Sequence, residues 1–278
     1  MFSAHKLARI STGIEGLDRM LDGGLIAGRT YMVTGNSGSG RSTLCGHFLM
    51  EGIKNGEEVL YVTIDSPPSD VSSTLSSYGW DAGKMMILNA HPKVREYKVR
   101  GSLIEVAGQR SVGAMSDMND KDKTAEKQGG TSADLSLPSL QLMLQKEFES
   151  KAYDRLVIDS MLSLRMLGAE EIQWELGINS VFRLLAEEGL TTILVSDSPK
   201  PGDNIRPEFF LSRGIISMNR LTVNGKLYRG IYVEKFRGSA HDSQIRPVKI
   251  TSKGMEVDTV RALPAEVIAE MSEDFPRP

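Results

Sequence analysis

A glycine-rich segment near the N-terminus has the residue types and the spacing of a phosphate-binding loop. Residues 34–43 read TGNSGSGRST and match the pattern G-x-x-x-x-G-K-[ST] at Gly35, Gly40 and Ser42. Glycines allow backbone N–H groups to curl around phosphate oxygens, and a serine at the last position places its hydroxyl on Mg²⁺. We therefore expect a nucleotide and Mg²⁺ here. The expected binding residues are Ser37, Gly38, Ser39, Gly40, Arg41, Ser42 and Thr43.

One position departs from this pattern, because Arg41 stands where a lysine is expected. A guanidinium keeps the positive charge but is planar, bulky and fork-shaped, whereas an ammonium is a point charge on a narrow stem. Backbone N–H groups and Mg²⁺ would still hold the phosphates. Stabilisation of a transition state depends more closely on the shape of the cation, so the substitution threatens hydrolysis more than binding.

The flanking residues supply the elements that position such a loop. Residues 29–33 are a β-branched and aromatic run, typical of a buried strand. After the loop, apolar residues recur at helical spacing from Leu44 to Ile53, and Asn55-Gly56 is a helix stop. A helix in this place directs its positive end at the phosphates.

A second apolar strand, residues 155–159 (RLVID), ends in Asp159 and is followed by Ser160. A carboxylate at the end of a strand beside a phosphate-binding loop holds the water shell of the metal, as in the Walker B element. We expect Asp159 to share this role with Ser42. The alternative is that Asp159 only caps the N-terminus of a following helix, and the two roles are compatible.

Composition narrows the class of protein. A net charge of −3 over 278 residues gives no general attraction to nucleic acid or to acidic membranes. The single cysteine, Cys45, excludes an intrachain disulfide and is expected as a small core residue. No apolar stretch resembles a signal peptide or reaches the length of a membrane span, so we expect a cytoplasmic protein.

Apolar runs alternate with helical patterns along the chain, which predicts an α/β fold with a mostly parallel central sheet flanked by helices. The expected strands are residues 30–33, 59–65, 156–159, 192–195 and 214–218, and the expected helices are residues 70–79, 137–150 and 170–188. Residues 228–237 and 247–257 alternate like antiparallel strands, with a hairpin turn at 223–226, and predict a C-terminal antiparallel β extension.

Two segments are unlike the rest. Residues 117–134 are polar, charged and without periodicity, and we expect a mobile loop over about 110–135. Residues 91–100 (HPKVREYKVR) are basic and are read either as a solvated face or as a contact for nucleic acid or a partner. We expect one domain over residues 1–260 and a tail over 261–278.

Taken in order, these segments resemble a KaiC-type ATPase of the RecA superfamily, over nearly the whole chain. The matching segments are residues 11–18 (STGIEGLD), 21–25 (LDGGL), the loop at 35–43, 60–68 (LYVTIDSPP), 156–162 (LVIDSML), 191–196 (TTILVS), 210–216 (FLSRGII) and 233–241 (VEKFRGSAH). The resemblance implies a RecA-like P-loop NTPase core that binds ATP and Mg²⁺.

The resemblance also implies an oligomer. Lys235 and Arg237 match a K-x-R motif whose cations reach the phosphates of the neighbouring subunit. Residues two apart on a strand point to the same side, so both could face one phosphate. A site completed by a neighbour requires a ring or filament, and a hexameric ring is favoured. A protein signalling partner is also possible. The alternative is that Lys235 and Arg237 are two solvated charges on an edge strand.

Two further positions depart from the family. Asp65-Ser66 replaces the paired glutamates that polarise the attacking water, and Arg213 stands where an acidic residue is frequent. Asp65 keeps a carboxylate on a shorter stem, and a displacement of about 1 Å can cost about 10²-fold in rate. We therefore predict an ATP-binding protein that hydrolyses ATP slowly or not at all. An active ATPase or autokinase, or a recombinase-like DNA-binding ATPase, are the alternatives.

Overall fold

The computed structural model describes residues 7–90, 98–99, 102–103, 136–166, 171–199 and 206–273. The chain forms two compact units, one of Met1–His91 with Leu135–Pro278 and the other of Pro92–Asp134. In the smaller unit, the described residues form a short antiparallel pair, β6 (Lys98–Val99) and β7 (Ser102–Leu103). The polar segment 117–134 and most of the basic segment 91–100 lie outside the described residues.

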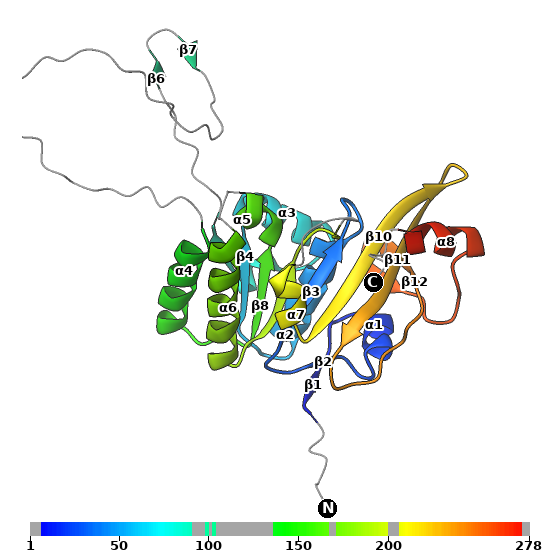
Figure 1. Cartoon of the computed structure of the whole chain (residues 1–278), viewed down its shortest axis with the longest axis horizontal. Helices are drawn as coiled ribbons and strands as arrows, with labels where there is room; N and C mark the ends of the chain where they lie inside the picture. The colour runs from blue at the N-terminus through cyan, green and yellow to red at the C-terminus, as the bar shows by residue number, and fades with distance from the viewer. Residues whose placement is uncertain are drawn as a thin grey trace, which may run out of the picture. The chain divides into compact units, whose positions relative to one another are not determined.

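A nine-stranded sheet forms the centre of the larger unit, in the order β13-β12-β11-β10-β3-β9-β8-β4-β5 (Figure 1). From β10 to β5 every neighbouring pair is parallel. These strands are β3 (Thr30–Gly35), β4 (Val59–Thr63), β5 (Met86–Asn89), β8 (Arg155–Asp159), β9 (Thr191–Val195) and β10 (Gly214–Val223). The predicted parallel α/β core is confirmed, and β5 is a strand that the sequence pattern did not indicate.

The C-terminal extension is antiparallel, as predicted. Strand β11 (Lys226–Phe236) returns along β10, and β12 (Arg246–Thr251) and β13 (Gly254–Val257) continue the sheet. The β10–β11 turn has positive φ at both central residues, 50° at Asn224 and 74° at Gly225. This is the conformation that an Asn-Gly pair favours in a two-residue hairpin.

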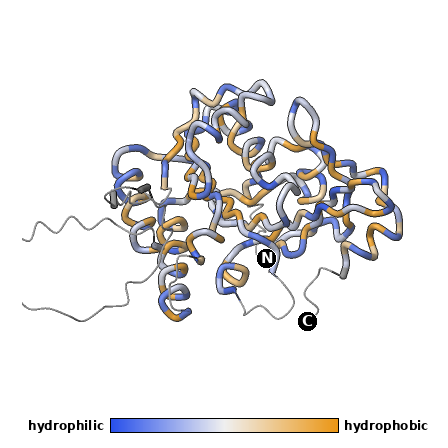
Figure 2. Tube along the Cα trace, turned by 90° about the horizontal axis from the view of Figure 1, so that it is seen from above, coloured by the Kyte–Doolittle hydropathy of each residue, from blue (hydrophilic) through white to orange (hydrophobic). Residues whose placement is uncertain are grey.

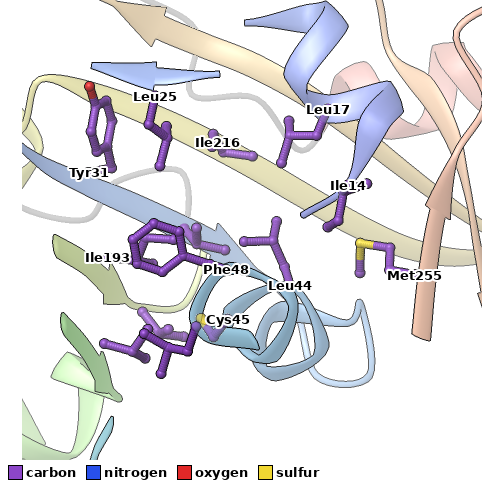
Figure 3. Close-up of a cluster of buried hydrophobic side chains, with 14 of the residues drawn as sticks. Ile14, Leu17, Leu25, Tyr31, Leu44, Cys45, Phe48, Ile193, Ile216 and Met255 are labelled. Atoms are coloured by element: carbon purple, nitrogen blue, oxygen red, sulfur yellow. The ribbon is translucent and has the colours of Figure 1, made fainter. Parts of the chain in front are cut away.

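Helices cover both faces of the sheet, because the strands alternate between two hydrophobic clusters. Tyr31 and Val33 of β3 face one cluster, and Met32 faces the other. The first face carries α1 (Glu15–Met20), α2 (Arg41–Lys54) and α3 (Pro68–Ser77); the second carries α4 (Leu137–Ser150), α5 (Met161–Met166) and α6 (Glu171–Glu187). Figure 2 shows hydrophobic segments along the inner strands, and Figure 3 shows Leu44 and Phe48 of α2 in the first cluster.

Shorter elements complete the larger unit. They are the antiparallel pair β1 (Arg9–Ile10) and β2 (Leu25–Ile26), the 3-10 helix η1 (Ala82–Lys84), α7 (Pro207–Leu211) and α8 (Ala265–Glu273). Within the expected tail, α8 buries Val267 and Met271 beside Val223 in a third hydrophobic cluster, and Figure 1 shows it next to the β10–β11 hairpin. In the described part of the chain, no helix has the length and apolar character needed to cross a membrane.

A buried arginine ties the start of β8 to the helix that follows the phosphate loop. The Arg155 side chain is 1% exposed and forms an ion pair with Glu57 through Nε. Its Nη1 donates to the carbonyl oxygens of Ser11 (2.7 Å) and Phe48 (2.8 Å), and its guanidinium lies 4.9 Å from the centre of the Phe48 ring. One side chain therefore fixes β8, α2 and the N-terminal segment relative to one another.

Candidate phosphate-binding site

The glycine-rich segment is a tight connection between β3 and α2, which is the geometry that the sequence predicts. Gly40, the residue before α2, has φ of 110°, and a Cβ there would lie 2.8 Å from the Met255 side chain. At Gly35 a Cβ would lie 2.2 Å from the carbonyl oxygen of Met218 on β10. Glycine is therefore required at both ends of the loop. The backbone conformation requires it at Gly40, and the close approach of Met218 requires it at Gly35.

Ser42 and Asp159 supply the hydroxyl and the carboxylate expected at the metal, and they lie together at the carboxyl ends of the parallel strands. Ser42 Oγ donates a hydrogen bond of 2.7 Å to Asp159 Oδ2. Tyr61 on β4 donates to the same oxygen, also at 2.7 Å. Burial, followed by the charge of Asp159, raises the Tyr61 pKa well above its usual value, so the phenol remains a donor at neutral pH.

Asp65 lies at the same edge of the sheet, because Thr63 of β4 is in register with Asp159 of β8. The Asp65 carboxylate is exposed and accepts hydrogen bonds from two hydroxyls of the following segment, Ser160 Oγ (2.7 Å) and Ser163 Oγ. The Ser66 carbonyl accepts a 2.6 Å hydrogen bond from Thr63 Oγ1. The structure thus places Asp65 near the phosphate loop and holds it by neighbouring serines.

The Arg41 side chain reaches across to the next strand of the sheet. Its Nη1 donates to the carbonyl oxygen of Ser196, the residue directly after β9. Asp197, the next residue, forms an ion pair of 2.9 Å with Arg206, which precedes α7. This contact directs the Arg41 guanidinium at the residue that follows β9.

The other loop residues differ in exposure. Asn36, Ser37 and Gly38 form an exposed apex, whereas Ser39 is 1% exposed and its hydroxyl has no hydrogen-bond partner within the described residues. Thr43 Oγ1 lies 3.3 Å from the hydroxyl of Tyr78. A buried hydroxyl without a partner in a phosphate-binding loop is an unused donor for an anion.

Cys45, two residues further along α2, is fully buried. Burial raises the pKa of its thiol well above the usual value, and the charge of Asp159 adds to this. A thiol in this state is not reactive, so the prediction of a small core residue is confirmed.

Lys235 and Arg237 lie toward the end of the strands that is opposite to the phosphate loop of the same chain. Gly35 at the start of the loop is in register with Met218 of β10, which pairs with Ile231 of β11. Lys235 is four residues further along β11, or about 13 Å at the usual strand rise. The same chain therefore does not bring its K-x-R pair to its own phosphate loop.

The two cations are close to each other. Lys235 Nζ donates to the carbonyl oxygen of Phe209 on α7, and Arg237 is exposed directly after β11. Burial, followed by the positive charge of Arg237, lowers the pKa of Lys235 to about 8. A lysine beside another cation in this way is stabilised by an anion.

Sequence reasoning missed several residues that contact the loop. In the sequence, Tyr61 has the pattern of an ordinary buried strand residue. Its contact with Asp159 arises only because β4 and β8 are neighbours in the sheet. Arg220 and Arg229 contact the loop apex from the β10–β11 hairpin. The Asn-Gly turn fixes the hairpin register and thus places these two arginines opposite each other, which is a signal that the sequence contains.

Comparison with known proteins agrees with this geometry. Residues 10–261 match the family model described as "ATPase: KaiC". The UPF0273 protein of Methanopyrus kandleri is 29% identical, over 90% of this chain and 92% of its own length. The circadian clock protein KaiC3 of Synechocystis is 24% identical over 89% of this chain, but this chain spans only 45% of that protein.

A solved structure shares the fold. The KaiC-like protein of Pyrococcus horikoshii superposes with a TM-score of 0.67 at 24% identity, over 91% of this chain and 99% of that protein. The predicted RecA-like fold is therefore confirmed. Because the family model covers most of the sequence, the chain belongs to the KaiC ATPase family.

Proposed function

We propose that this protein binds ATP with Mg²⁺, hydrolyses it slowly or not at all, and acts in the cytoplasm as a nucleotide-dependent oligomeric regulatory module. The observation that carries this proposal is the 2.7 Å hydrogen bond between Ser42 and Asp159 at the base of an intact phosphate loop. Hydroxyl and carboxylate oxygens are the ligands that Mg²⁺ prefers, together with phosphate oxygens and water.

The residues present fit this ligand. Ser37 to Thr43 would offer backbone N–H groups to the phosphates, and the buried Ser39 hydroxyl supplies a further donor. Ser42 and Asp159 would hold the metal, which neutralises charge on the phosphates when bound. Tyr61, bonded to Asp159, fixes the orientation of that carboxylate.

Slow hydrolysis follows from how two side chains are held. Arg41 donates to the Ser196 carbonyl, and Asp65 accepts hydrogen bonds from Ser160 and Ser163. A base must reach the proton that it abstracts, and a transition-state cation must reach the developing charge. Both groups have protein partners in this structure, so we infer that neither is free to act as its counterpart does in an efficient ATPase.

We further propose that Lys235 and Arg237 act on the nucleotide of a neighbouring copy. They lie away from their own loop, and burial and the neighbouring Arg237 lower the pKa of Lys235, so an anion brought to this pair would stabilise both charges. A cation supplied by a neighbour is worth about 10³–10⁵ in rate where hydrolysis occurs. Each site then requires two copies, and a hexameric ring is the favoured assembly.

Two measurements test this function. Mg²⁺·ATP and a slowly hydrolysed analogue should raise the unfolding temperature of the wild type and of the control Ser150→Ala, whose exposed hydroxyl lies at the end of α4. The rise should be smaller for Asp159→Asn at the same ligand concentration. Steady-state phosphate release should stay below about 1 s⁻¹, the lower end of ordinary enzymes. A faster rate would establish an active ATPase and overturn the claim of weak hydrolysis.

The same preparation separates the alternatives. Transfer of labelled γ-phosphate to the protein itself would indicate an autokinase. Salt-dependent retention on single-stranded DNA would indicate a recombinase-like protein. Neither result is expected.

A further inference from the structure

The β10–β11 hairpin is attached to the apex of the phosphate loop. The Asn36 side-chain amide donates from Nδ2 to the Arg220 carbonyl (2.7 Å) and accepts at Oδ1 from the Arg220 backbone N–H (2.9 Å). These two bonds continue the β3–β10 ladder beyond Gly35 and Met218. The apex of the loop is therefore fixed to the backbone of β10.

Two guanidinium groups of the hairpin meet at one glycine of that apex. Arg229 Nε donates to the Gly38 carbonyl at 3.0 Å. Arg220 lies against the same residue, since a Cβ on Gly38 would be 2.6 Å from Arg220 Nη1 and 3.3 Å from its Cδ. Gly38 itself has φ of 75°, so a glycine here allows both the turn and the close approach of the arginine.

This pair of like charges is unfavourable in isolation. Arg220 and Arg229 are direct partners across the β10–β11 ladder, where like charges facing each other are destabilising. Within the part of the chain that the structure describes, neither side chain has an acidic partner. Arg220 is exposed and Arg229 is half-buried. An anion at the loop apex would relieve the repulsion.

We propose that Arg220 and Arg229 bind the phosphate chain of the nucleotide held by this loop, from within the same copy. They thereby supply cationic charge at the loop that a lysine in place of Arg41 would otherwise supply, because Arg41 is directed at Ser196. This inference rests on the proposed function, and it assigns to the hairpin a binding role separate from that of Lys235 and Arg237.

Glutamine substitutions test the proposal, because glutamine keeps a donor for Gly38 but removes the charge. The dissociation constants of Mg²⁺·ADP and of a slowly hydrolysed Mg²⁺·ATP analogue are measured for Arg220→Gln, Arg229→Gln and the double variant. Each lost charge-assisted hydrogen bond should weaken binding of the ATP analogue about tenfold or more, and weaken ADP less. The double variant Arg220→Lys with Arg229→Lys should recover part of this loss.

Two controls separate binding of phosphate from support of the loop. Asn36→Ala removes the bonds to the Arg220 backbone but keeps both charges, so it should leave the ratio of ATP to ADP affinity unchanged. Arg183→Gln, a 74% exposed arginine on α6, should have no effect. Without nucleotide, the double glutamine variant should unfold at the same or a higher temperature than the wild type, since it removes a like-charge pair.

The results that would refute the role of Arg220 and Arg229 differ from those that would refute ATP binding itself. If the wild type binds the ATP analogue and the double glutamine variant binds it equally well, the role of the two arginines is wrong while ATP binding stands. If the glutamine variant loses retention on single-stranded DNA but keeps nucleotide affinity, the pair binds nucleic-acid phosphates and the proposal is overturned. If the wild type binds no nucleotide, both proposals fail.

Discussion

The buried Arg155 offers a direct test of how the site is held, through the substitution Arg155→Met. Methionine replaces the aliphatic stem and fits an apolar setting, but it is shorter than arginine and cannot replace the ion pair with Glu57 or the hydrogen bonds to the Ser11 and Phe48 carbonyls. We expect the change to be strongly destabilising, because three groups lose their partner at once.

The expected magnitude follows from the burial of each group. Breaking a buried ion pair by removing one member costs about 3–5 kcal/mol. The Glu57 side chain is 25% exposed and recovers part of its hydration, which lowers this figure. Each carbonyl that loses its donor adds about 1 kcal/mol. With an ion-pair contribution near the low end of this range and about 2 kcal/mol for the two carbonyls together, we expect a loss of about 5 kcal/mol in the free energy of unfolding.

Urea unfolding followed by circular dichroism measures this loss, with an unchanged dependence on denaturant as the check that the folded state is intact. The matched control is Arg183→Met, because that side chain is 74% exposed and lies 3.9 Å from Glu187. The control should cost less than about 0.5 kcal/mol. A loss below about 1 kcal/mol for Arg155→Met would contradict the reasoning.

Three further predictions concern the site and its surroundings. Burial lowers the pKa of His47 to about 4, and its Nε2 accepts the backbone N–H of Met255 at 2.7 Å, so the unfolded chain takes up a proton that the folded chain refuses. The contribution of His47 to the free energy of unfolding should be fully present above about pH 6.5. It should fall by about 1 kcal/mol by pH 5, a figure reduced because the side chain is partly exposed. The variant His47→Gln should lose this part of the pH dependence in urea unfolding. Tyr61→Phe should weaken Mg²⁺-dependent ATP binding about tenfold by calorimetry and leave metal-free binding unchanged, since it frees Asp159; equal loss in both conditions would refute this role. Arg41→Lys should raise phosphate release about tenfold or more, and an unchanged rate would instead identify Asp65-Ser66 as limiting.

Local sequence signals predicted most of the fold. The loop glycines, the apolar strands and the Asn-Gly turn act over a few residues, and each is found where the pattern placed it. Helix α4 was predicted with its observed ends, Leu137 and Ser150. Such elements are predictable because backbone conformation and the burial of alternate residues depend on near neighbours.

Contacts within the site could be predicted only in part. The proximity of Ser42 and Asp159 followed from a known pairing of motifs, but the partner of Arg41 is Ser196, separated by 155 positions. That contact depends on β9 lying between β3 and β8, which no local pattern reveals. The helix α8 was missed although its signal is local, because Val267, Ile268 and Met271 lie at helical spacing after Pro264; only its packing on the outer hairpin depends on the fold.

The most direct test of the central claim is a calorimetric titration of the wild type and of Asp159→Asn with a slowly hydrolysed ATP analogue in the presence of Mg²⁺. The site described above predicts saturable binding of one nucleotide per chain by the wild type, weakened at least tenfold in Asp159→Asn, because that carboxylate holds the metal with Ser42. Absence of saturable binding by the wild type, or equal affinity in the two proteins, would contradict the assignment of this loop as an ATP site.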